Sequence, residues 1–382
     1  MKNKMPRLVR LLLTAALALS VGLVSLYCVY MIWETPPERE TAPLEARADA
    51  ALPPQSAEPT EIAATATPEP TGAGGVYTLL LVGNDDGNGN TDALLLCRLD
   101  TGAHSLRVLS IPRDTLVNAD WEVRKINAVY WGDRLYGGDG IGALRRHVAM
   151  LTGFAPNNYA VLDLSDLVTA VDLLGGVRFD VPMAMHYDDA SQNLHIRLEP
   201  GEQTLSGEQA MWLCRYRSGY VSGDLGRIEM QQQFLRAALE QFAELGKVPN
   251  LMQAAEYLAG AVDTDLTAAN MAWYARQMLL CRDDVQFLTL PTENATVHGY
   301  SYAVVSLSDW LAMLNGSLNP FERDLTAEDL DLVYRAGGAY VGTKGLRGSW
   351  YYARTANAAT PEESPLPALG PRIIAVMPGK AV

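Results

Sequence analysis

The segment LLLVGNDDGNGNTDALLLC, residues 79–97, places a run of Asp, Asn and Gly between two apolar stretches. Continuous apolar runs bounded by turn residues predict strands that are buried on both faces of a sheet. Because Gly and Asn are ordinary turn residues, an Asx-rich hairpin turn is the commoner explanation of the polar run. Its aspartates would nevertheless lie at the end of adjacent strands, where a divalent cation with oxygen ligands would relieve their repulsion. On this segment alone, both explanations stay open.

Strand and helix patterns alternate outward from this segment. Apolar runs predict further strands at residues 106–112, 158–164 and 177–182. Helical spacing appears at 140–153, at 165–176 between Ser165 and Gly175–Gly176, at 229–246, and after Thr267. Ser206 and Gln209 have the spacing of a capping box, which predicts another helix start. Strands and helices interleaved in this way predict an α/β fold, a central mixed β-sheet flanked by helices.

The N-terminal residues predict a membrane anchor. A basic flank, residues 1–10, precedes the uncharged stretch Leu11–Ile32, which as a helix would rise roughly 33 Å and cross a bilayer core. A cleaved signal peptide is the alternative, but such segments end in small residues, whereas this one ends in YCVYMIWE. We therefore expect a transmembrane anchor at 11–33, a cytoplasmic N-terminus and an extracytoplasmic remainder in the cell membrane.

Composition divides the rest of the chain and limits its partners. Residues 34–75 are rich in Pro, Ala, Thr and Glu, which predicts a disordered extracytoplasmic linker. One folded domain is expected at 76–325, followed by a Gly-rich and then Pro-rich C-terminal extension at 326–382. The formal net charge of the 382-residue chain is −14, which argues against a nucleic-acid partner.

Arginines are the clearest candidates for a binding site. In LSIPRDTLV, residues 109–117, an apolar strand leads into Arg113, which is either a structural partner of Asp114 or a functional group. In CRYRSGYVSGDLGRIEMQQQ, residues 214–233, Arg215 and Arg217 would share one face of a strand, and Arg227 would follow on the next helix. Converging arginines repel one another unless an anion offsets them, so this segment predicts a phosphate site. Cys97 and Cys214 were both expected in strands, either as buried thiols or as a pair.

The motifs as a set resemble the LytR–CpsA–Psr family. They are LLLVGND…NTDALLL, LSIPRDT, KINAVY, VDLLGGV, PGEQTLSGEQAMWLCRYR and GDLGRIEMQQQFL, in the family's order from about Leu79 to Leu290. The resemblance implies membrane-anchored phosphotransferases that move glycopolymers, such as wall teichoic acid or capsular polysaccharide, from a polyprenyl-pyrophosphate carrier to peptidoglycan. It also implies a phosphodiester product and assistance by magnesium, or manganese in its place.

The resemblance also implies roles for individual residues. Asp85 and Asp92 match the two family aspartates at the metal, and Asp92 would be the base for the attacking hydroxyl. The implied catalytic set is Asp92, Arg113 and Arg217. The residues expected to bind pyrophosphate are Arg113, Lys125, Arg215, Arg217, Arg227 and Gln231.

One departure from the family affects the loop in residues 79–97. Many members have Arg-Ser-Asp where this chain has Asn90-Thr91-Asp92, so one anion contact is absent or supplied elsewhere, and Asp86 is an alternative to Asp85 at the metal. Two other functions stay open: hydrolysis of polyprenyl pyrophosphate with water as acceptor, and a non-catalytic, regulatory protein that binds envelope polymers. The paired aspartates disfavour the second, because a binder has no evident need of repelling carboxylates beside its arginines.

Overall fold

The computed structural model describes residues 35–38, 75–84, 91–190, 194–242 and 248–347 of the chain. In these ranges, no helix has both the length and the apolar character needed to cross a membrane. The predicted anchor at 11–33, most of the predicted linker and residues 348–382 lie outside the described residues. The same holds for Asp85, Asp86 and Asn90.

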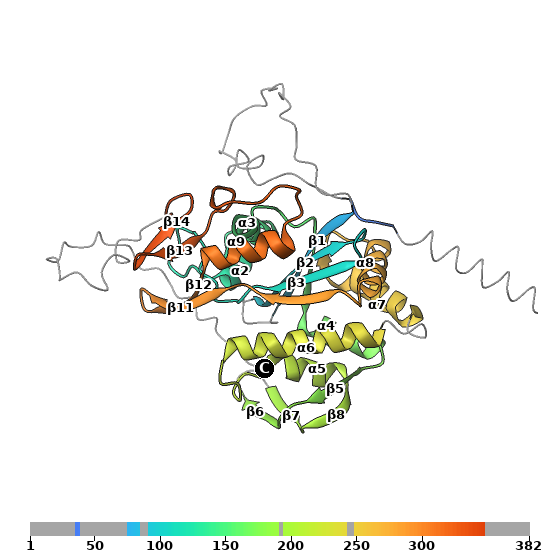
Figure 1. The fold of residues 1–382 in the computed structure, drawn as a ribbon. Helices are drawn as coiled ribbons and strands as arrows, with labels where there is room; N and C mark the ends of the chain where they lie inside the picture. Colours follow the sequence, from blue (N-terminus) through green and yellow to red (C-terminus); the bar gives the residue numbers. More distant parts are fainter. Residues whose placement is uncertain (1–34, 39–74, 85–90, 191–193, 243–247, 348–382) are drawn as a thin grey trace, which may run out of the picture.

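A six-stranded mixed sheet forms the centre of the fold (Figure 1). Its strands are β1 (Val76–Asn84), β2 (Thr91–Asp100), β3 (Ser105–Ser110), β4 (Asn158–Asp163), β9 (Asp263–Thr264) and β10 (Val285–Thr289), in the order β10-β3-β2-β1-β4-β9. β1 pairs antiparallel with β2 and parallel with β4. The β1–β2 register shifts between Gly83 and Asn84, and such bulges commonly re-aim side chains next to functional sites.

Helices cover both faces of the sheet, as its continuous apolar strands require. Alternate β1 side chains point to opposite faces, so Leu80 and Val82 lie in one core and Tyr77 and Leu79 in another. The first core also contains α3 (Ile141–Thr152) and α9 (Leu307–Met313), and the second contains α8 (Ala268–Leu280). The predicted α/β fold with a central mixed sheet and flanking helices is confirmed.

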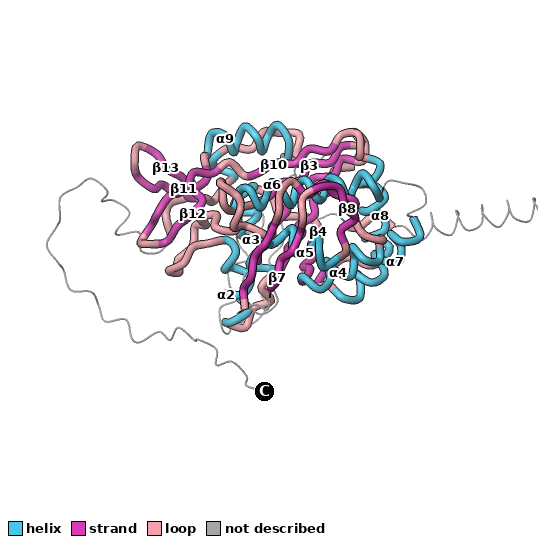
Figure 2. Tube along the Cα trace, turned by 90° about the horizontal axis from the view of Figure 1, so that it is seen from below, coloured by secondary structure: helices cyan, strands magenta, loops and turns pink. Residues whose placement is uncertain are grey.

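A helix-and-hairpin unit packs against α6, and its strands lie on the side of α6 away from the sheet (Figure 1). It contains α4 (Leu164–Leu173), β5 (Val177–Val181), β6 (Met185–Asp189), β7 (Leu194–Leu198), β8 (Gly201–Leu205) and α5 (Gly207–Arg215). The helix α6 (Asp224–Phe242) contributes Met230 and Phe234 to this unit's core and Leu239 to the core under the sheet. Figure 2 shows the unit from below, with β7 and β8 toward the viewer. α6 thus packs against both cores, and it also lines the pocket described below.

The remaining elements complete the body. A 3₁₀ turn (Ile126–Ala128) and α2 (Val129–Leu135) follow the KIN motif, and α7 (Val248–Ala261) precedes β9. A four-stranded sheet contains β11 (Thr292–Val297), β12 (Tyr300–Val305), β13 (Val333–Ala336) and β14 (Ala339–Gly342). A π-helical turn (Leu314–Leu318) and a 3₁₀ turn (Ala327–Asp329) connect α9 to β13. Leu330 and Leu332 are buried in the same core as Leu80, so packing continues across the predicted boundary between Leu325 and Thr326.

Several local predictions can be compared with the structure. The capping box of Ser206 and Gln209 is present at the start of α5, and α8 begins after Thr267 as predicted, with Thr267 as its cap. Helix α4 begins earlier than predicted, because Asp163 rather than Ser165 provides its cap. Cys97 is in a strand, but Cys214 lies in the last turn of α5, and neither forms a disulfide.

Candidate functional site

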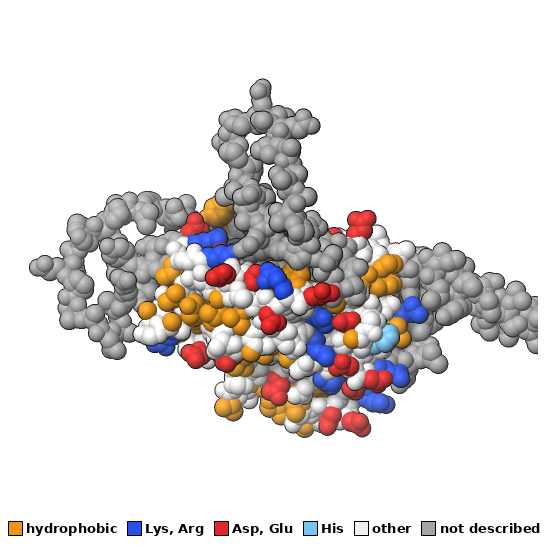
Figure 3. Space-filling model, turned by 45° about the horizontal axis from the view of Figure 1, so that its top comes forward, with side chains coloured by type: hydrophobic (Ala, Val, Ile, Leu, Met, Phe, Trp, Pro, Cys, Tyr) orange, Lys and Arg blue, Asp and Glu red, His pale blue; other side chains and the backbone are white. Residues whose placement is uncertain are grey.

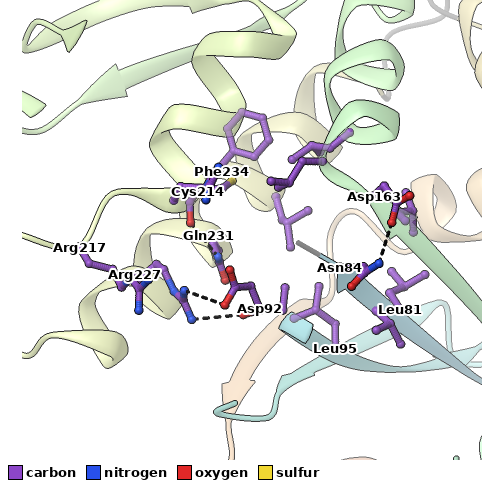
Figure 4. A pocket seen from close by; sticks show the side chains of 18 residues that line it. Leu81, Asn84, Asp92, Leu95, Asp163, Cys214, Arg217, Arg227, Gln231 and Phe234 are labelled. Atoms are coloured by element: carbon purple, nitrogen blue, oxygen red, sulfur yellow. Dashed lines mark hydrogen bonds and ion pairs between the residues drawn. The ribbon is translucent and has the colours of Figure 1, made fainter. Parts of the chain in front are cut away.

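A pocket opens at the carboxyl ends of the parallel strands β1 and β4, the edge at which ligands commonly bind in α/β sheets (Figure 4). Its volume is about 200 Å³. The sheet forms one wall, and α4, α5 and α6 form the other. Its lining residues are Leu81, Val82, Gly83, Asn84, Asp92, Ala93, Leu95, Leu162, Asp163, Leu164, Leu167, Cys214, Arg215, Arg217, Arg227, Gln231, Phe234 and Leu235.

The lining is divided by chemistry. Leucine side chains from β1, β2, β4 and α4, together with Phe234 and Leu235 of α6, make most of the wall apolar. Arginines and Asp92 lie together on one side of the pocket, where Figure 4 shows Arg227 next to Asp92 and Arg217 beyond Arg227. A ligand that fills this pocket would therefore have an anionic part and an apolar part.

Asp92 is the centre of the polar side. Its Oδ1 accepts a hydrogen bond from Arg113 Nη1 at 2.8 Å and lies 3.7 Å from Arg227 Nη1. Arg227 Nη2 also donates to the backbone oxygen of Asp92 at 3.2 Å. Arg113 is outside the pocket lining but reaches it through Asp92. The structure therefore brings these three predicted site residues together, and Arg113 pairs with Asp92 rather than Asp114.

Asp224 is a site residue that the sequence analysis missed. It begins α6, and its Oδ1 lies 2.8 Å from Arg227 Nη2 and 3.7 Å from Arg113 Nε. Asp224 therefore bridges the same two arginines as Asp92. The sequence does indicate the Asp224–Arg227 contact, because residues three apart are neighbours on the surface of a helix.

Burial and the neighbouring carboxylates have opposite effects on the charge of Arg113 and Arg227. Arg227 is only 2% exposed, and burial lowers the pKa of its guanidinium, opposed by Asp224 and Asp92 and assisted by Arg113 and Arg217. Burial also opposes the charge of Arg113, but Asp224 and Asp92 outweigh it and raise the pKa of that guanidinium. Guanidinium groups remain charged at neutral pH despite such shifts. The Nε atoms of Arg113 and Arg227 are buried and have no hydrogen-bond partner among the described residues.

Arg215 and Arg217 line the pocket as predicted, but not on a strand. Arg215 is the last residue of α5, Tyr216 caps the helix in an extended conformation, and exposed Arg217 begins the following loop. The prediction of two arginines on one face of a strand is therefore wrong. Gln231 donates to the backbone oxygen of Cys214 at 3.0 Å, which joins α6 to the end of α5 and holds these arginines at the pocket.

Lys125 is placed differently from the resemblance-based expectation. Its Nζ lies 3.0 Å from Asp114 Oδ1 and 5.8 Å from the centre of the Tyr302 ring. It is not among the residues lining the pocket, although Asp114 follows Arg113 directly. In this structure, Lys125 supports the segment that carries Arg113 and does not reach the pocket itself.

A second polar group lies across the pocket from the arginines (Figure 4). Asn84, at the end of β1, donates to Asp163 Oδ1 at 2.9 Å and accepts from Trp131 Nε1 at 2.9 Å. Asp163 ends β4, so parallel pairing of β1 and β4 brings these side chains together. The sequence analysis did not single out this pair, although residues at the ends of adjacent strands were a usable signal.

The described donors are compatible with a magnesium site, which stays a prediction. No group of three or more His, Cys, Asp or Glu side chains suited to a metal occurs within the described ranges. Magnesium, however, is usually held by only one or two carboxylates together with substrate phosphates. Asp92 offers one such carboxylate beside arginines suited to phosphate, and its predicted partner Asp85 is outside the described residues.

Cys214 is the one sulfur nucleophile in the described pocket lining, and it is not activated. Burial raises the pKa of its thiol to about 12, although Arg227 opposes the shift. Because the thiolate is the reactive form, we expect Cys214→Ala to keep turnover within about one order of magnitude of wild type. Steady-state kinetics on both proteins would check this, and a far larger loss in Cys214→Ala would indicate covalent catalysis.

Charges of both signs occur on the described surface. On the face drawn in Figure 3, acidic and basic side chains are interspersed and form no broad basic surface. Broad basic surfaces are the usual requirement for nucleic-acid binding.

Comparisons with known proteins relate the chain to several cell-envelope proteins. It is 26% identical to the polyisoprenyl-teichoic acid–peptidoglycan teichoic acid transferase TagU of Oceanobacillus iheyensis. The alignment spans 232 residues and covers 60% of this chain and 71% of TagU. It is 26% identical to TagV of Bacillus subtilis, over 50% of each chain. It is also 26% identical to the regulatory protein MsrR of Staphylococcus aureus, over 58% of this chain and 66% of MsrR.

Solved structures share the fold. The crystal structure of B. subtilis TagV matches with a TM-score of 0.54 and 21% identity, over 63% of this chain and 95% of TagV. The structure described as TagT bound to LIIa-WTA matches with a TM-score of 0.53 and 18% identity, over 65% of this chain and 92% of TagT. The model of the LytR_cpsA_psr family matches residues 51–317, which contain the pocket and all of the arginines around it. The chain belongs to the LytR_cpsA_psr family.

Proposed function

We propose that the chain is a membrane-anchored, extracytoplasmic phosphotransferase that moves an anionic glycopolymer from a polyprenyl-pyrophosphate carrier to peptidoglycan. One observation carries the proposal: the buried guanidinium of Arg227, whose Nε–H has no hydrogen-bond partner among the described residues, lies with Arg215 and Arg217 at one side of a pocket whose other walls are mostly apolar. A polyprenyl pyrophosphate has this division, an anionic head and an apolar tail. The transferase names of the relatives TagU and TagV, which act on teichoic acid and peptidoglycan, support the same substrate class.

The arginine cluster suggests how substrate would change the site. Without ligand, Arg113 and Arg227 are paired with Asp92 and Asp224, so the four described charges balance. Phosphate oxygens would accept from the unpaired Nε–H groups and compete with Asp92 for both arginines. Binding of the pyrophosphate would thereby loosen Asp92 from Arg113 and make its carboxylate available for the reaction.

The reaction is proposed as a single displacement at phosphorus. An acceptor hydroxyl of peptidoglycan bonds to the phosphorus that carries the polymer, its proton passes to Asp92, and polyprenyl phosphate leaves with the electrons of the broken P–O bond. Arg113, Arg227 and the pocket-lining Arg215 and Arg217 would stabilise charge on the phosphate oxygens, the main requirement of phosphoryl transfer. Magnesium held by Asp92 and by the predicted ligand Asp85 would neutralise further phosphate charge.

The transfer assay separates the candidate functions. Full-length chain in liposomes would receive a polyprenyl-pyrophosphate disaccharide, magnesium and peptidoglycan oligomers, and mass spectrometry would follow polyprenyl phosphate and linked product. We expect both products to form together. Release of polyprenyl phosphate without a linked product would indicate a hydrolase instead. Binding without turnover would contradict an enzymatic function and favour a regulatory role of the kind named for MsrR.

Filling the apolar part of the pocket should weaken binding of the lipid tail selectively. Leu95 of β2 lines the pocket, and Leu95→Trp would occupy space needed by about two methylene groups, a cost of ~1.6 kcal/mol or roughly tenfold in affinity. Calorimetric titration with a polyprenyl pyrophosphate should show this loss, while the affinity for inorganic pyrophosphate stays unchanged. Leu280→Trp is the matched control, because Leu280 is 48% exposed at the end of α8. Equal losses for both ligands in Leu95→Trp would contradict a tail-binding pocket.

A further inference from the structure

Residues Thr35–Glu38, far from the domain in sequence, lie against its surface. Pro37 is buried, whereas the other three residues of this segment are exposed. Asn270 Nδ2 donates to the backbone oxygen of Thr35 at 2.9 Å and lies 3.4 Å from Thr35 Oγ1. In Figure 1 the segment, coloured blue, runs beside β1 and α8. It follows the predicted transmembrane anchor at 11–33 almost directly.

The groove that receives this segment is built from side chains already fixed by other contacts. The space between segment and domain is bordered by Thr35–Glu38 on one side, and on the domain side by Arg145, Asn157, Asn158, Asp265, Thr267 and Asn270. Asn270 Oδ1 accepts from the backbone and the hydroxyl of Thr267 at 3.0 and 2.7 Å, which turns its amide nitrogen toward Thr35. Arg145 donates to Pro156 O at 2.8 Å, and Asp265 accepts from Tyr159 N at 2.9 Å. A prearranged groove lowers the entropic cost of docking a short segment.

Charge and connectivity favour this segment as the occupant. Glu38 borders the same groove as Arg145, so the charges are complementary. The groove also adjoins the amino end of β1, since Thr78 N donates to Asn157 Oδ1 at 2.8 Å. Glu38 and the start of β1 at Val76 therefore lie at the same edge of the sheet. Because both ends of the connection between them lie at this edge, the effective concentration of the segment at the groove is high.

The groove and the pocket lie at opposite edges of the sheet. Asn157 and Asn158 are at the start of β4, whereas the pocket residues Leu162 and Asp163 are at its end. β1 runs parallel to β4, so the two sites are separated by the length of the strands, roughly 20 Å for six residues.

We propose that Thr35–Glu38 is a docking segment that holds the amino-terminal edge of the sheet close to the membrane and directs the pocket edge away from it. The proposal rests on the predicted anchor that forms part of the proposed function. If residues 34–75 acted only as a flexible linker, the domain would sit roughly 35 Å from the anchor on average and rotate freely. Docking replaces that linker with the short connection from Trp33 to Thr35 and gives the pocket a fixed height and orientation relative to the bilayer.

Neutron reflectometry on full-length chain in supported bilayers would measure the position of the domain. The segment variant combines Thr35→Gly, Pro36→Ser, Pro37→Gly and Glu38→Ser, which leaves the groove and the pocket unchanged. We expect wild type to form a narrow protein layer at the bilayer surface and the segment variant a broader one, with its centre farther out by about 20 Å or more. Identical profiles for the two proteins would overturn the proposal.

Hydrogen exchange provides a second readout that does not depend on the anchor. In the segment variant, backbone amides of Asn158 and at the start of α8 should exchange several-fold faster than in wild type, because the segment no longer covers them. Asn294→Ala, which changes an exposed asparagine of β11, should leave both the exchange and the layer unchanged. Unchanged exchange in the segment variant would disprove docking. Altered exchange in a chain that fails to enter bilayers would instead uphold docking and disprove the anchor.

Discussion

Arg227→Met is expected to lower the rate of polyprenyl phosphate release by about 10²–10³-fold, the loss typical when one preorganised donor to a developing negative charge is removed. Arg227 is 2% exposed and contacts Asp92 and Asp224 together, so its charge is fixed at the pocket before substrate binds. Methionine fills much of the same volume, so the effect should come from charge. Single-turnover kinetics with a polyprenyl-pyrophosphate disaccharide would measure it.

Arg236→Met is the matched control for this prediction. Arg236 lies on the same helix, is exposed, and contacts Phe287 outside the pocket. It should therefore leave the rate unchanged. The unfolding free energy of Arg227→Met should fall by less than the about 3–5 kcal/mol typical of a broken, fully buried ion pair, since Asp92 and Asp224 remain 24% and 29% exposed. Wild-type turnover in folded Arg227→Met would contradict the role assigned to the cluster.

Asp92→Asn should separate binding from turnover. The amide keeps the size of the side chain but can neither take the proton of an acceptor hydroxyl nor hold a cation as a carboxylate does, so turnover should fall about 10²–10⁴-fold, the usual contribution of a general base. Affinity for polyprenyl pyrophosphate should be retained or increased, because Asp92 no longer competes with phosphate for Arg113 and Arg227. Rate and affinity measured on the same preparation would test both statements.

Asp180→Asn is the control for Asp92→Asn, because Asp180 is exposed on β5 and far from the pocket in the fold. Two results would contradict the proposed role of Asp92. Unchanged turnover in Asp92→Asn would exclude it as the base, and a parallel loss of affinity and turnover would make it a structural partner of the arginines only.

The central sheet was predictable because its local signals agree with its tertiary environment. The runs at β1 and β2 are continuous and apolar, and both of their faces are buried. The capping box at Ser206 is equally local, so it predicts a helix start without knowledge of packing. Asp92, Arg113 and Arg227 were candidates from the family resemblance and from strand ends, and the structure places them in contact.

The errors have physical causes as well. The run AMWLC before Arg215 is short and apolar, and periodicity alone does not distinguish a strand from a buried helix in such a run. The helix capped at Ser206 continues through it and carries Arg215 to the pocket in its last turn. Asp224 and Asn84 were missed because their roles depend on partners brought together by the fold, Arg113 for the first and Asp163 for the second.

The most direct test of the proposed transfer follows oxygen from water. The full-length chain, a polyprenyl-pyrophosphate disaccharide and peptidoglycan oligomers would react in ¹⁸O-enriched water, and mass spectrometry would locate the isotope in each phosphate product. Transfer to a peptidoglycan hydroxyl predicts a phosphodiester-linked product and polyprenyl phosphate, both without ¹⁸O. A free sugar phosphate or polyprenyl phosphate that carries ¹⁸O, with no linked product, would contradict transfer and show that water is the acceptor.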